Sequence, residues 1–195
     1  MSTVKMELYH TSSAEIESPD VNYGRRNADF GGGFYLSDSL DFVTKWSSER
    51  NNCVNRYTLD LTDLKVKRFE HSDEWFDYIA NNRVGNKDRF GDCDVIIGPI
   101  ANDTLYDTYG IIFSGLLTHV DALKLLAVGK EYTQINVKTE KAAKQLTWEG
   151  ATILQSGEIA KARESVKAEE AEFRNAFNTA LEALENADEI DEILG

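Results

Sequence analysis

Two segments near the N-terminus carry residues suited to holding a small ligand. Residues 8–12 read LYHTS and place His10 at the end of a short apolar run. Residues 29–38 read DFGGGFYLSD, so three glycines lead directly into two aromatic residues. Glycine lets a backbone approach a ligand closely because it has no Cβ. The two segments therefore predict a binding site. The simpler alternatives are that the glycines form only a tight turn and that His10 only makes a hydrogen bond within the fold.

Other kinds of site have little support. The histidines His10, His71 and His119 lie in unrelated contexts, and Cys53 and Cys93 have no metal-ligand spacing. Neither a metal site nor a Ser-His-Asp triad is therefore expected. The glycine run has the wrong spacing for a dinucleotide fingerprint, is followed by a strand pattern rather than a helix, and lacks the lysine of a phosphate loop.

The elements that position these residues follow no regular order, because the strand patterns neither alternate strictly with helix patterns nor come in hairpin pairs. This order favours an α+β fold over a doubly wound one. Strands are expected over residues 6–9, 34–36, 55–61, 66–69, 94–99 and 131–137. Helices are expected over 73–81, 105–112, 120–126 and 140–146, and directly after a Ser37-Asp38 cap, where Phe42, Val43 and Trp46 would share one face. Residues 12–27 are polar and contain Pro19, so we expect a loop with room for one helical turn.

The C-terminal part differs in character, and it divides the chain into a domain over residues 1–150 and an acidic helical extension over 157–195. Residues 158–194 lack glycine and proline and contain eleven acidic and four basic residues. Glu169 interrupts a near-heptad seam. The seam consists of Ile159, Ala162, Val166, Phe173, Ala176, Ala180, Ala183, Ala187, Ile190 and Leu194. We expect a long helix or a helical hairpin that packs on its own domain, docks to a protein partner or self-associates.

The composition limits the classes of partner. Of 195 residues, 42% are hydrophobic, and 34 acidic against 21 basic residues give a net charge of −13. This charge repels nucleic acid and anionic lipid at long range. The chain has no long apolar run and no apolar leader pattern, and its two cysteines form no framework, so a soluble cytoplasmic protein without a membrane partner is expected.

Three motifs resemble those of the diphtheria-toxin-like and poly(ADP-ribose)-polymerase-like ADP-ribosyltransferases. Residues 8–12 resemble the family's L-x-H-G-S strand, residues 30–38 its F-G-x-G-I-Y-F-A-D segment, and residues 132–137 its Y-x-E-Y-x-V strand. The resemblance covers roughly residues 5–148, and a group of uncharacterised bacterial and phage proteins shares the signature. It implies a split mixed sheet with peripheral helices.

The resemblance also implies roles in binding NAD as a co-substrate, without a metal. His10, Tyr35 and Gln134 would be the catalytic residues. His10 would donate a hydrogen bond to the adenosine-side ribose, and the backbone of Thr11 would pair with the carboxamide, with Ser12 hydrogen-bonding nearby. Tyr35 and Trp46 would stack on the nicotinamide. Gly33 would allow close approach, and Arg25 and Arg26 would clamp the pyrophosphate, unless they are simply a solvated pair.

Gln134 stands where the family has its catalytic glutamate. A glutamine still accepts a hydrogen bond from the ribose, but it is neutral and is no base. The leading hypothesis is a mono-ADP-ribosyltransferase acting on an unidentified protein or nucleic acid, in a toxin or in a defence or phage effector. The alternatives are a non-catalytic module that binds NAD or a partner, an RNA 2′-phosphotransferase, which the acidic charge disfavours, and an interaction protein that works through its C-terminal helix.

Overall fold

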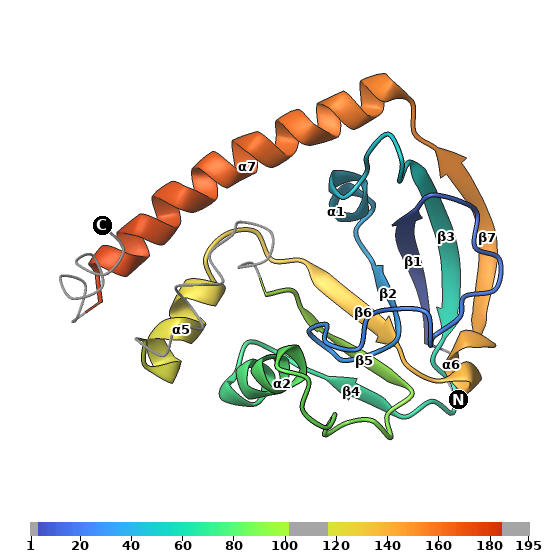
Figure 1. Ribbon diagram of the computed structural model, residues 1–195, viewed down its shortest axis with the longest axis horizontal. Helices are drawn as coiled ribbons and strands as arrows, with labels where there is room; N and C mark the ends of the chain where they lie inside the picture. The colour runs from blue at the N-terminus through green and yellow to red at the C-terminus, as the bar shows by residue number, and fades with distance from the viewer. Residues whose placement is uncertain (1–3, 102–116, 185–195) are drawn as a thin grey trace.

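A mixed β-sheet forms the centre of the computed structural model, which describes residues 4–101 and 117–184 (Figure 1). Its strands are β1 (Lys5–Ser12), β2 (Phe34–Ser37), β3 (Cys53–Asp60), β4 (Val66–Arg68), β5 (Val95–Pro99), β6 (Thr133–Val137) and β7 (Leu146–Ile153). The described helices are α1 (Leu40–Lys45), α2 (Asp73–Arg83), α5 (His119–Leu126), α6 (Glu140–Ala143) and α7 (Ser156–Glu182). The strands lie in the order β4-β5-β6-β2-β1-β3-β7. This confirms the predicted α+β class.

Backbone pairing in the sheet is sparsest between the central strand β2 and its neighbour β1. β1 pairs antiparallel with β3 along its whole length, from Lys5 to Ser12. Within the described residues, it pairs with β2 at Tyr9 and Ser37 alone. β4 and β5 are parallel, whereas the other neighbours are antiparallel. The sheet is therefore split between β1 and β2, and His10 is the first residue of β1 after the single paired position at Tyr9.

Strand alternation separates an apolar face from a polar face on β2 and β6. Successive side chains of a strand point to opposite faces. Phe34, Leu36 and Ile135 belong to one buried cluster, and Leu36 lies opposite Ile135 in the register. Tyr35 lies opposite Asn136 on the other face, and Gln134 follows one pleat away. Tyr35 and Gln134 of the predicted site therefore share a face, because they alternate with core residues.

The shorter helices begin at hydroxyl caps, as their sequences require. Ser39 caps α1, Ser72 caps α2, Thr118 caps α5 and Thr139 caps α6, each accepting from a backbone N–H of the first turn. The predicted Ser37-Asp38 cap is wrong, since Ser37 ends β2 and its hydroxyl donates to the carbonyl of Thr133. Phe42 and Val43 are buried as expected, but Trp46 is the C-cap residue and is half-exposed.

The strand β7 was missed by the sequence patterns. The predicted helix over 140–146 ends at Ala143, and β7 begins at Leu146. Gly150, at φ 120°, lies opposite the irregularity between Arg56 and Tyr57 of β3. A glycine inside a strand weakens the strand pattern and often marks such a bulge. The loop predicted over residues 12–27 is observed over 13–27, because Ser12 still belongs to β1. The predicted helix over 105–112 lies outside the described residues.

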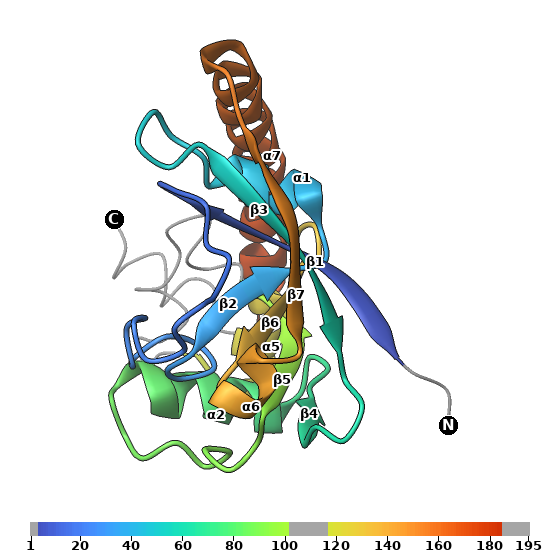
Figure 2. The same ribbon diagram turned by 90° about the vertical axis from the view of Figure 1, so that its right-hand side faces the viewer.

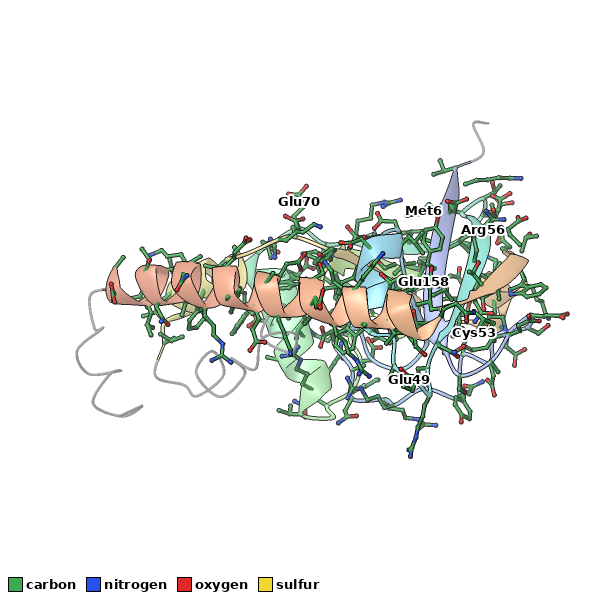
Figure 3. All side chains as sticks on the ribbon, turned by 90° about the horizontal axis from the view of Figure 1, so that it is seen from above. Met6, Glu49, Cys53, Arg56, Glu70 and Glu158 are labelled. Atoms are coloured by element: carbon green, nitrogen blue, oxygen red, sulfur yellow. The ribbon has the colours of Figure 1, made fainter. Side chains whose placement is uncertain are left out.

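Helix α7 packs on its own domain as one continuous helix through Glu182. Figure 1 shows it leaving the end of β7, passing α1 and reaching α5. In Figure 2 its first turns lie at the opposite end of the molecule from α2 and α6. Seen from above, it runs lengthwise with Glu158 in its first turn (Figure 3). Ile159 joins a cluster with Phe42 and Leu154. Further along, Phe173 and Phe177 join the cluster of α2 and α5.

The buried face of α7 departs from the predicted seam. Phe177, Leu181 and Leu184 are buried, whereas Ala176 and Ala183 are exposed. A straight helix drifts by about 20° per heptad, so a face followed over several turns moves away from a strict seven-residue repeat. The last seam positions, from Ala187 onward, lie outside the described residues.

Glu169 interrupts the apolar seam because it forms an ion pair. The Lys45 side chain of α1 is 1% exposed, and its Nζ lies 2.5 Å from Glu169 Oε1 and 2.8 Å from Asp41 Oδ2. It also donates to the Tyr132 hydroxyl. Burial alone lowers the pKa of Lys45, but these hydrogen bonds outweigh it and raise the pKa above its ordinary value. The charge pair thus holds α7 against α1.

Replacing Lys45 should therefore destabilise the protein. Lys45→Met keeps the aliphatic packing but leaves Glu169 without its buried partner, which should cost about 3 kcal/mol of the free energy of unfolding. Lys130 is the matched control, because its Nζ also bonds Asp41 and lies over the Tyr132 ring, yet its side chain is 56% exposed. Lys130→Met should change stability by less than about 0.5 kcal/mol. Equal losses in urea denaturation would contradict the assigned role of Lys45.

Candidate functional site

A cavity of about 600 Å³ lies where β1 and β2 diverge. Consecutive residues of both strands line it, together with the end of α1 and the loop before residues 30–33, which we call the glycine turn. The predicted site residues in its wall are His10, Thr11, Ser12, Arg25, Gly33, Tyr35, Trp46 and Gln134. Its volume falls within the range of about 300–1,000 Å³ that small-molecule sites take. The structure thus brings together all but one of the residues that the sequence singled out.

His10 bridges the split in the sheet with its side chain. Its Nδ1 lies 2.7 Å from the carbonyl oxygen of Tyr35, and its ring packs 4.5 Å from that of Phe34. A carbonyl only accepts, so Nδ1 carries the proton of this hydrogen bond. Burial lowers the pKa of His10 below its ordinary value, against the opposing effect of the Tyr35 carbonyl. The imidazole is therefore neutral at pH 7, and Nε2 is an acceptor rather than the donor that the resemblance implies.

Tyr35 fixes the glycine turn from within the cavity. Its hydroxyl accepts from the backbone N–H of Phe30 at 2.9 Å and donates to the carbonyl of Gly31 at 2.7 Å. Burial, aided by the nearby charge of Asp29, raises the pKa of Tyr35 well above its ordinary value. The phenol is therefore a neutral anchor whose ring is left to form part of the cavity wall.

Asn136 supports the same turn from β6. Its Nδ2 donates to the carbonyls of Phe30 and Gly32, at 2.9 and 3.2 Å. Gly31 and Gly33 have φ values of 75° and 149°, which favour glycine. A Cβ on Gly33 would overlap Asn136 Oδ1 and lie 2.7 Å from the carbonyl oxygen of Val137. Tyr35 and Asn136 thus define the shape of the glycine turn.

Gln134 belongs to a hydrogen-bond network that extends through Asp29 to the end of α2. Its Nε2 donates to Asp29 Oδ2 at 3.2 Å. The other carboxylate oxygen, Oδ1, lies 2.8 Å from Arg83 Nε, and both of these side chains are largely buried. Asn82 donates to the backbone carbonyl of Asp29 at 2.9 Å. Asp29 lines the cavity beside Gln134.

Thr11 and Ser12 line the cavity while their hydroxyls bond to the protein. Thr11 Oγ1 donates to the carbonyl of Val43 at 2.6 Å, which ties β1 to α1. The Ser12 hydroxyl donates to the carbonyl of Ala14 and accepts from Asn55 Nδ2 at 3.0 Å. These side chains hold the C-terminal end of β1 in place, so a ligand would meet a rigid wall here.

The two predicted arginines face different cavities. Arg25 lines the cavity between β1 and β2, and neither arginine forms an ion pair within the described part of the chain. Arg26 lines a second cavity of about 370 Å³ behind Gly31 and Gly32. Trp46 lies at the rim of the first cavity, with its ring edge-on to Phe42 at 6.0 Å. Of the two arginines predicted to clamp a pyrophosphate, Arg25 therefore lines the cavity between β1 and β2 and Arg26 does not.

Sequence reasoning missed Asp29, Asn136 and Arg83. Asp29 directly precedes the turn over residues 30–33, and Asn136 lies two residues after Gln134 on the same face of β6, so both had a local signal. Arg83 had none, because only the packing of α2 brings it to Asp29. Within residues 4–101 and 117–184, no three His, Cys, Asp or Glu side chains come together as metal ligands. None of the described helices has both the length and the apolar character needed to cross a membrane.

A family model described as a protein of unknown function (DUF3990) matches residues 6–148. The chain belongs to the DUF3990 family. The match runs from β1 into β7, and so includes the split between β1 and β2, the glycine turn and Gln134. Among curated proteins, no relative matches this DUF3990 chain significantly.

Gly33 and Gly32 offer a direct test of the glycine turn. Gly33→Ala should lower the free energy of unfolding by about 3 kcal/mol, because its Cβ overlaps Asn136 and the backbone is strained for any other residue. In Gly32→Ala the nearest atom, Arg26 Cγ, is 3.7 Å from the new Cβ. Denaturant unfolding should therefore find Gly32→Ala close to wild type. Similar losses in both variants would contradict the described shape of the turn.

The lowered pKa of His10 predicts acid sensitivity. As pH falls below the ordinary value of 6.5, the unfolded chain binds a proton that folded His10 still excludes. Stability from this group is therefore complete above pH 6.5 and declines below it, by at most about 1.4 kcal/mol per pH unit.

His10→Asn is the matched variant, since its amide is able to donate to the Tyr35 carbonyl without titrating. Unfolding free energies measured between pH 7.5 and 5 should fall more steeply for wild type than for this variant. His71, whose pKa burial also lowers, contributes equally to both proteins. Parallel pH profiles would contradict a buried, neutral His10.

Proposed function

We propose that this DUF3990 protein is an NAD-dependent mono-ADP-ribosyltransferase. The observation that carries the proposal is the meeting of His10, Tyr35, Trp46 and Gln134, which come from four separate segments, in the wall of one cavity. Their types and order resemble those of the ADP-ribosyltransferase motifs. The wall also contains Gly33, where a glycine is required because a Cβ would overlap Asn136.

Each of these groups fits one part of NAD by its chemistry. The ring of Tyr35, with Trp46 at the rim, offers aromatic surface to the cationic nicotinamide, an attraction of about 1–2 kcal/mol per ring when desolvated. Neutral His10 presents Nε2 as an acceptor for a ribose hydroxyl. Arg25 supplies the positive charge that a pyrophosphate requires.

The proposed reaction breaks the bond between the ribose C1′ and the nicotinamide nitrogen. The bonding electron pair leaves with nicotinamide, and positive charge develops on the ribose. A nucleophile of the acceptor then bonds to C1′ and loses its proton. Gln134 accepts a hydrogen bond from a ribose hydroxyl through Oε1 but takes no proton, so the acceptor must be nucleophilic or activated elsewhere.

A second candidate is a non-catalytic module that binds NAD or a partner in the same cavity. The observation that favours it is the neutral Gln134, whose amide already donates to Asp29. The two candidates share the binding residues and differ in whether nicotinamide is released. Binding of NAD measured by calorimetry, together with release measured by chromatography, distinguishes them.

Substitutions of Tyr35 test the proposed stacking. Tyr35→Ala should lower nicotinamide release at least about 30-fold, since it removes the aromatic face that holds the leaving group. Tyr35→Phe keeps the ring and loses only the bonds of the hydroxyl to Phe30 and Gly31, so it should stay within about tenfold of wild type. Circular dichroism of both variants checks folding. Undiminished release by folded Tyr35→Ala would refute the assignment of Tyr35.

A further inference from the structure

We propose that Asp29 is a positioning residue that directs the Gln134 carbonyl oxygen to the substrate and supplies the negative charge that Gln134 lacks. This inference rests on the proposed transferase function. It starts from three contacts within the described residues: Gln134 Nε2 to Asp29 Oδ2, Arg83 Nε to Asp29 Oδ1, and Asn82 Nδ2 to the Asp29 carbonyl.

The first contact sets the orientation of the Gln134 amide. A carboxylate accepts hydrogen bonds and donates none, so the amide nitrogen must face Asp29. Oε1 then points away from Asp29, and none of the described hydrogen bonds engages it. Gln134 is buried apart from its exposure in the cavity wall. Its free acceptor is thereby available to a ribose hydroxyl.

The second contact sets the orientation of the ion pair between Arg83 and Asp29 relative to the cavity. Arg83 binds Oδ1 of Asp29, whereas Oδ2 faces Gln134 at the cavity. The Asp29 side chain is 15% exposed and that of Arg83 is 8% exposed. The ion pair therefore has its negative end toward the cavity, in surroundings where charges are less screened than in water. Such a field stabilises positive charge that develops on the ribose as nicotinamide leaves.

The third contact fixes Asp29 from the backbone. Asn82 and Arg83 both belong to the end of α2, so one helix holds the main chain and the side chain of Asp29. Asp29 also immediately precedes the turn that Tyr35 and Asn136 anchor. The carboxylate is therefore placed by the same elements that shape the cavity. An arrangement fixed in advance is what electrostatic stabilisation of a transition state requires.

An exchange of the two side chains tests this proposal. Asp29→Asn keeps an acceptor for one neighbour but removes the charge, and should lower kcat for nicotinamide release at least about 30-fold with KM for NAD within about threefold. Gln134→Glu alone places two carboxyls in contact, so one retains its proton near neutral pH and kcat becomes dependent on pH.

The double variant Asp29→Asn/Gln134→Glu restores one amide and one carboxylate. The introduced asparagine is then able to accept from Arg83 and donate to the introduced carboxylate. We expect kcat within about tenfold of wild type and a flat pH profile around neutrality. The result that would overturn the proposal is a folded Asp29→Asn with wild-type kcat, or a double variant no more active than Gln134→Glu.

Asp88 provides the matched control. It is a partly buried carboxylate that pairs with the buried Lys138 and bonds Tyr78, and it lines the second cavity rather than the first. Asp88→Asn should leave kcat within about threefold of wild type. A loss of kcat in Asp88→Asn equal to that in Asp29→Asn would overturn the proposal, because it would mean that any buried carboxylate near the turn matters equally.

A titration separates this proposal from the transferase function. If wild-type protein releases no nicotinamide, the proposed function fails, and carbon NMR of the carboxyl introduced by Gln134→Glu still tests the pairing. Its pKa should be raised in the single variant and should fall when Asp29→Asn is added. An identical pKa in both proteins would overturn the contact on which the proposal depends.

Discussion

The hydrogen bond from His10 to the Tyr35 carbonyl is the interaction on which the cavity depends. It joins β1 to β2 beyond Tyr9 and Ser37, where the backbone ladder between the strands has ended. Two paired strands leave no room for a ligand between them, and two unpaired strands expose backbone groups that need partners. A side chain that bonds one carbonyl across the split satisfies part of this need while keeping the strands apart.

On the β2 side of the cavity, a second set of side-chain hydrogen bonds replaces backbone pairing. Asn136 and the Tyr35 hydroxyl bond the backbone of the glycine turn, so the turn keeps its shape without a regular ladder. Both side chains come from the polar face of strands whose other face is core. The period of two in β2 and β6 thus places Phe34, Leu36 and Ile135 in one buried cluster and Tyr35, Gln134 and Asn136 on the opposite face. A change of register by one residue would exchange these faces.

The sequence was informative where chemistry and local pattern coincide. His10, Tyr35 and Gln134 stand in short strands with clear alternation, and all three line the cavity. Arg26 follows Arg25 directly, yet the turn of the loop sends it behind the glycines, which no periodicity encodes. Arg83 and Asp29 are far apart in the chain, so their pairing appears only when α2 packs. Trp46 was assigned to a buried helical face because the pattern does not reveal that the helix ends at Lys45.

Helix α7 contributes no described residue to the cavity wall, but it contacts α1, which does. Phe42, Val43 and Trp46 form one side of the cavity, and all three lie on or directly after α1. That short helix is held by Thr11 from β1 on one side and by the Lys45–Glu169 pair from α7 on the other. A helix of six residues has little stability by itself. Glu169, the acidic residue that interrupts the apolar seam of α7, therefore helps to hold the side of the cavity that Phe42, Val43 and Trp46 form.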